Sequence, residues 1–137
     1  MTDLTKGFAL NSPALFVPWD VTDQGLTTLF AGLSIKRVTR GYYVIECEPF
    51  AGLLCSLGFH LHGTLDELEF FRSSYIDQRK SYEEFQSHLE TAFGDPTHTG
   101  SGSEGFPSHT WLMPGARIIH HVIDRFGPEE HVRIIRA

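Results

Sequence analysis

The segment from Leu53 to Pro96 constrains the fold more than any other part of the chain. Between residues 53 and 62, apolar side chains occupy every second position, which is the period of a strand with one buried face. Gly63-Thr64 then offers a two-residue turn with glycine first, and residues 65–71 resume the alternation. The segment therefore predicts a β-hairpin. The inward side chains of its first strand are Leu53, Cys55, Leu57, Phe59 and Leu61.

The two-residue turn also predicts which residues face each other across this hairpin. A shift of one residue would turn every apolar side chain to the opposite face, so the register is expected to be firmly held. On the outer face, the same register sets His60 opposite Glu67. The other expected pairs are His62 with Leu65, Phe59 with Leu68, and Leu57 with Phe70.

A helix is predicted after the hairpin. Ser81-Tyr82-Glu83-Glu84 has the pattern of a capping box, Gly94 suits the end of a helix, and Pro96 prevents continuation. Because a helix of this length is marginal alone in water, its apolar stripe must pack on the sheet. The stripe consists of Tyr82, Phe85, Leu89, Ala92 and Phe93.

The remaining segments predict an α+β fold, a single domain spanning residues 1–137. Thr22 or Asp23 caps a short helix, and residues 97–107 form a long glycine- and serine-rich loop. Further strands are expected at 35–38, 42–48, 108–113, 116–124 and, after a turn at 126–128, at 131–135. The expected architecture is an antiparallel sheet of about six or seven strands built from hairpins, with one or two helices packed on one face.

Composition limits the possible partners and the compartment. With 41% hydrophobic and 20% charged residues, the chain is expected to be soluble and globular. The net charge of −6 excludes nucleic acid and anionic membranes as favoured partners, because both attract clustered Lys and Arg. We expect no signal peptide and no membrane span, and therefore a cytoplasmic protein.

The two cysteines, Cys47 and Cys55, share the inward register. They are interpreted as inert buried thiols, although a disulfide between paired strands stays open.

His60-Leu61-His62, followed by Glu67, is the sharpest chemical pattern. Two histidines at i and i+2 on a strand point to the same side, and a carboxylate follows. The spacing resembles the metal-binding part of the cupin motif, which implies a metal held by His60, His62 and Glu67. The chain lacks that motif's glycine six residues before His60, and the alternation sets both histidines on the outer face. The alternative is a cross-strand histidine–glutamate pair, with no cofactor.

Two further regions are candidate binding sites. The loop before residue 107 leads into Phe106, His109 and Trp111, and long loops and exposed aromatic residues are typical of interaction sites. A hairpin around Pro114-Gly115 would set His109 opposite His120, on a partly exposed face. The acidic surface expected on the helix carries Glu83, Glu84 and Glu90, which would favour a basic partner.

Three hypotheses of function follow. No catalytic motif is recognisable, so the leading one is a non-catalytic protein-binding domain, of the class of small bacterial immunity or adaptor proteins. The second is a small metal-dependent enzyme using His60, His62 and Glu67. The third is a small-ligand-binding domain in which the sheet and the 94–107 loop enclose a pocket. Monomer and homodimer both stay open.

Overall fold

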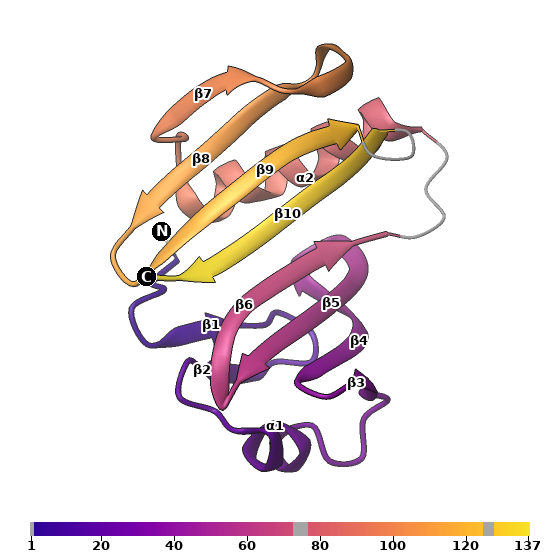
Figure 1. Cartoon of the computed structure of the whole chain (residues 1–137), viewed down its shortest axis with the longest axis vertical. Helices are drawn as coiled ribbons and strands as arrows, with labels where there is room; N and C mark the ends of the chain where they lie inside the picture. Colours follow the sequence, from indigo (N-terminus) through magenta and orange to yellow (C-terminus); the bar gives the residue numbers. More distant parts are fainter. Residues whose placement is uncertain (1, 73–76, 125–127) are drawn as a thin grey trace.

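The computed structural model describes residues 2–72, 77–124 and 128–137. It is an α+β fold with one large antiparallel sheet, one small two-stranded sheet and helices (Figure 1). In chain order the elements are β1 (Gly7–Ala9), β2 (Phe16–Pro18), α1 (Asp23–Leu29), β3 (Lys36–Thr39), β4 (Tyr42–Phe50), β5 (Leu53–His62), β6 (Thr64–Phe71), α2 (Gln78–Phe93), β7 (His98–Ser101), the 3₁₀ helix η1 (Ser103–Gly105), β8 (Pro107–Met113), β9 (Ala116–Asp124) and β10 (Pro128–Arg136).

The large sheet consists of two four-stranded meanders joined edge to edge. Its strand order is β3-β4-β5-β6-β10-β9-β8-β7, and every pairing is antiparallel. After β6 the chain runs through α2 to the far edge, then returns strand by strand until β10 lies beside β6 (Figure 1). The pairing of β6 with β10 therefore closes the sheet.

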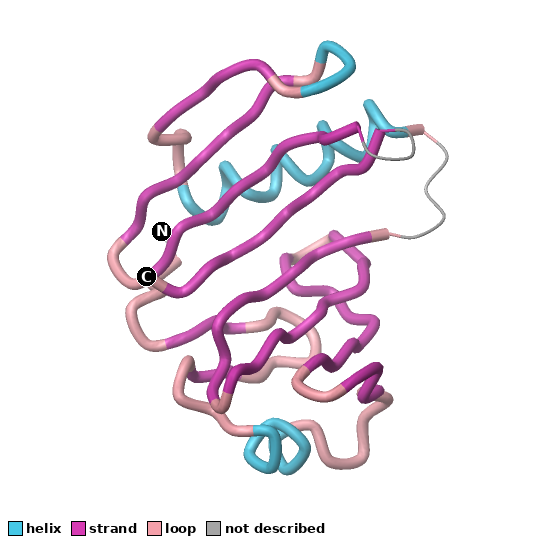
Figure 2. The backbone as a smooth tube through the Cα atoms, viewed as in Figure 1, coloured by secondary structure: helices cyan, strands magenta, loops and turns pink. Residues whose placement is uncertain are grey.

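One face of the sheet carries the hydrophobic core, and two different segments cover it. The N-terminal segment and α1 pack on the β3–β6 half, where Phe8 contacts Phe70 and Phe30 contacts Phe59. Helix α2 crosses behind the other half (Figure 2). The two covers meet near Phe50, whose ring lies edge-on to Phe93 of α2. The opposite face of the sheet has no such cover within the described chain, and we call it the outer face.

The hairpin of β5 and β6 confirms most of the predicted register. Phe59 lies opposite Leu68, Leu57 opposite Phe70, and His60 opposite Glu67. The prediction was wrong at the turn, where His62 pairs with Thr64 instead of Leu65, because the register shifts between His60 and Leu61. The shift places an extra residue in β6, so the loop is shorter than the two residues predicted.

The predicted strand number was too low. The additional strand of the large sheet is β7, which lies within the segment predicted to be a loop and pairs with β8. Its four residues, His-Thr-Gly-Ser, are all exposed and contain no apolar alternation, so sequence periodicity could not detect it. The remaining expected strands and both helices are present. The turn predicted at Phe126-Gly127-Pro128 lies partly outside the described residues.

The predicted start of α2 was also wrong. The N-cap is Asp77, whose side chain accepts a hydrogen bond from the backbone N–H of Lys80 at 3.1 Å. Ser81 is therefore inside the first turns, and its hydroxyl donates to Glu130 of β10 at 2.7 Å instead of capping the helix. At the other end, Gly94 terminates the helix as predicted, with φ of 80°.

Two glycines at hairpin turns provide a matched test of how the N-terminal segment packs against the turn between β8 and β9. Gly115 (φ 91°) lies against the N-terminal segment, and an added Cβ would be 2.5 Å from the Leu4 carbonyl oxygen. Gly63 (φ 80°) has open space around it. We expect Gly63→Ala to lower the free energy of unfolding by about 1 kcal/mol, from backbone strain alone. Gly115→Ala should cost about 3 kcal/mol or more, because overpacking adds to the strain. Urea unfolding of both variants measures the difference, and equal losses would contradict the docking of the N-terminal segment.

A candidate ligand pocket between α2 and β8

A pocket of about 410 Å³ lies between one face of α2 and the segment that enters β8. The helix residues that line it recur three or four positions apart, as one helix face requires. The lining residues are Arg79, Tyr82, Glu83, Gln86, Ser87 and Glu90 from α2, with Phe106, Pro107 and His109 from the opposite wall. We call this cavity the α2–β8 pocket.

Tyr82 ties the two walls together. Its hydroxyl lies 2.9 Å from the carbonyl oxygen of Pro107 and 3.1 Å from that of His120, and donates to these acceptors. Its ring stacks on His120 at a centroid distance of 3.7 Å and also packs against Phe106. Burial raises the pKa of Tyr82, so the phenol stays protonated and keeps its donor. The two walls of the pocket are thus joined by hydrogen bonds and ring contacts within the chain.

Behind Tyr82, His120 is fully buried and joins α2 to the sheet. Its Nδ1 donates to Oε1 of Gln86 at 2.8 Å, and its Nε2 lies 2.6 Å from Oε2 of Glu130. Gln86 can only accept here, because its Nε2 donates to Glu90 at 2.7 Å. Burial lowers the pKa of His120, while the hydrogen bond to Glu130 opposes that shift.

The hydrogen-bond network continues from Glu130 across the helix. Its second oxygen accepts from Ser81, whose hydroxyl oxygen accepts in turn from Arg72 Nη2 at 2.9 Å. Arg72 also pairs with Glu84 at 3.1 Å, and its guanidinium lies 4.6 Å above the ring of Phe85. Buried polar groups of this kind destabilise a fold unless they are paired, and here they pair with one another.

The structure brings together some of the predicted binding residues and separates others. Phe106, His109, Glu83 and Glu90 all line the α2–β8 pocket. Glu84 turns away to Arg72.

Trp111 and His120 lie in the interior. Trp111 is buried in the core, and its indole N–H donates to the carbonyl of Gly94 at 2.9 Å. His120 lies opposite His109, as predicted; His109 is partly exposed, as expected, whereas His120 is fully buried beneath α2. The expected hairpin around Pro114-Gly115 gave the correct pairing, while the docking of the helix decided the burial of His120.

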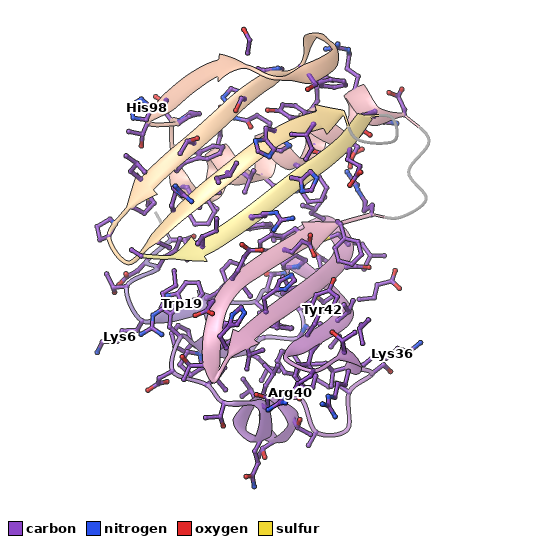
Figure 3. All side chains as sticks on the ribbon, in the orientation of Figure 1. Lys6, Trp19, Lys36, Arg40, Tyr42 and His98 are labelled. Atoms are coloured by element: carbon purple, nitrogen blue, oxygen red, sulfur yellow. The ribbon has the colours of Figure 1, made fainter. Side chains whose placement is uncertain are left out.

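On the outer face, His60 belongs to a network of ion pairs. Arg133 donates to Glu67 at 2.7 Å and to Glu69 at 3.3 Å. His60 lies 3.4 Å from Glu69 and 4.0 Å from Glu67, and its ring stacks on Tyr42, labelled in Figure 3. The hydrogen bond with His60 lowers the pKa of Glu69, and burial raises the pKa of Tyr42 to about 12. The predicted histidine–glutamate pairing is therefore present as part of a larger cluster.

The predicted metal ligands do not converge. His62 is 84% exposed at the side chain and pairs with Asp66, while His60 turns to Glu69. Among residues 2–72, 77–124 and 128–137, no group of three or more His, Cys, Asp or Glu side chains is placed to hold a metal ion.

The two cysteines are free, buried and directly opposite each other on β4 and β5. Burial raises the pKa of both thiols to about 12, so neither is a thiolate at neutral pH.

Sequence analysis did not identify several residues of the site. Gln86 and Ser87 could have been found from their spacing along the helix, whereas Arg79 precedes the helix start that the sequence predicted. Glu130 had no comparable signal, because its role depends on the pairing of β10 with β9 and on the docking of α2.

Comparison with known proteins adds no family. No protein-family model and no curated protein matches the chain. Among solved structures, the crystal structure of a DUF4309 family protein, YjgB, from Bacillus subtilis has a TM-score of 0.48 and 10% identity, and the match covers 100% of this chain and 87% of that one. A similarity of this degree identifies neither a family nor a function. Separately, none of the described helices combines the length and the apolar character needed to cross a membrane.

The histidines around the pocket and on β9 predict that stability depends on pH. Burial lowers the pKa of His109, His120 and His121 below the ordinary 6.5. Between the lowered values and 6.5 the unfolded chain binds more protons, so the free energy of unfolding falls as the pH falls. We expect urea titrations to give a lower free energy at about pH 5.5 than at about pH 7.5.

The control for this prediction is the exposed His62. His62→Gln should keep the pH dependence, whereas His120→Gln should weaken it and also lower stability by about 1–3 kcal/mol at neutral pH. Equal stability of the unmodified protein at the two pH values would contradict the prediction.

Proposed function

We propose that this chain is a non-catalytic binding domain and that the α2–β8 pocket is its ligand site. The observation that carries the proposal is the pocket itself, whose volume of about 410 Å³ lies in the range typical of small-molecule sites. Its lining combines aromatic and apolar surface with several polar groups, as such sites do. His120, the group most suited to acid–base chemistry, is sealed beneath Tyr82 and fully buried, which favours binding over catalysis.

A protein partner is the second candidate occupant. Glu83 and Glu90 are both exposed at the pocket, where a basic side chain of a partner can reach them. Charge reversal of these two residues would then weaken the complex, while Glu84 contributes to the Arg72 network instead.

We also propose a cytoplasmic location, because both cysteines are free thiols and structural disulfides belong to oxidising compartments.

Filling the pocket tests the proposal. Ser87 is exposed on the pocket face of α2, so Ser87→Trp should fill the cavity without disturbing the core. The unmodified protein is screened against small polar aromatic fragments by two-dimensional NMR. We expect hits that shift the amide signals of Ser87 and His109, and loss of those hits in Ser87→Trp.

Thr91→Trp is the matched control. Thr91 is an exposed residue one turn further along the same helix, and it lines a separate hollow of about 290 Å³ beside the N-terminal segment. Its variant should bind the same fragments as the unmodified protein. Hits that survive Ser87→Trp, or that disappear only in Thr91→Trp, would refute the α2–β8 pocket as the site.

A further inference from the structure

The charge of the α2–β8 pocket is concentrated on the helix wall. Glu83 and Glu90 are seven residues apart on α2, and their backbones are therefore about 10 Å apart along the pocket. Glu90 accepts one hydrogen bond from Gln86, and within the described residues neither carboxylate has an ion-pair partner. Both carboxylates thus keep oxygen lone pairs that a ligand can use.

The positive charge in the pocket comes from Arg79, which already contacts the opposite wall. The guanidinium of Arg79 lies 4.7 Å above the ring of Phe106, where a cation–π interaction holds it against the wall. His109 adds no charge at neutral pH, since burial lowers its pKa below 6.5. Two carboxylates therefore face one guanidinium, and the pocket favours a positively charged ligand.

The second wall is apolar. Phe106 and Pro107 line it together with the ring of His109, whose Nδ1 lies 3.2 Å from the hydroxyl of Thr99. A ligand that bridges the two walls needs a cationic end for the helix and a flat or apolar body for the β8 side. Its ammonium group would form charge-assisted hydrogen bonds with carboxylate oxygens.

We propose that the α2–β8 pocket binds a small organic amine, with its ammonium group at Glu83 or Glu90 and its apolar body against Phe106, Pro107 and His109. This inference rests on the proposed function, because it names the class of ligand for the same pocket.

Three probes that share one ring test the charge preference. Benzylamine, benzyl alcohol and benzoate are positive, neutral and negative at neutral pH, and each is titrated into the labelled protein at low salt by two-dimensional NMR. We expect benzylamine to bind about fivefold more tightly than benzyl alcohol, and benzoate to bind most weakly, as exposed charge pairs allow. Added salt should remove most of the difference, because the carboxylates are exposed.

Neutral variants locate the effect. In Glu83→Gln with Glu90→Gln, benzylamine should bind no better than benzyl alcohol, while the affinity for benzyl alcohol stays unchanged. Glu46→Gln is the matched control, since Glu46 is exposed on β4, away from the pocket, and its loss should change nothing.

The outcomes separate the two proposals. Equal binding of the three probes, a preference for benzoate, or no benzylamine binding at millimolar concentration would overturn the amine inference. If Ser87→Trp still abolishes binding of uncharged fragments in such a case, the pocket stands as a ligand site. Benzylamine binding that persists in Ser87→Trp would instead overturn both proposals.

Discussion

The hydrogen bonds of His120 hold α2 in its position on the sheet. The imidazole joins Gln86 of the helix to Glu130 of β10, and it lies in the interior, where an unpaired polar group would cost several kcal/mol. The helix can therefore not slide or rotate without breaking these hydrogen bonds. The same docking fixes Tyr82 against Pro107, so the geometry of the pocket depends on a residue that does not line it.

The pairing of β6 with β10 has a comparable role for the sheet. It joins the two meanders and sets Arg133 opposite Glu69 on the outer face, while Ile134 faces Leu68 on the core side. As a result, Glu67 forms an ion pair with Arg133 and lies 4.0 Å from His60. His60 and Glu67, from the pattern that resembles a metal-binding motif, thus take part in cross-strand contacts, and such contacts contribute modestly to stability at a partly exposed site.

Much of the fold could be predicted because its strands have one buried face. The alternation from Leu53 to Leu61 fixed the inward side, and the pairs Phe59–Leu68 and Leu57–Phe70 followed from it. Sequence reasoning failed where this signal is missing. Strand β7 has no apolar side chain and forms its ladder with β8, and the turn at Gly63 contains a register shift that periodicity does not encode.

The site was less predictable than the fold, because its parts come from distant segments. Phe106 could be chosen as a candidate because a long loop leads into it, and Glu83 because of its charge, but nothing local indicates that they share a pocket. The misplaced helix start had a specific effect: reading Ser81 as a cap excluded Arg79 from the helix and removed Ser81 from the interior network. A hydroxyl can cap a helix or pair with a buried carboxylate, and only the position of Glu130, 49 residues away, decides between them. Tertiary packing thus selects the role of a polar residue that local sequence leaves with two.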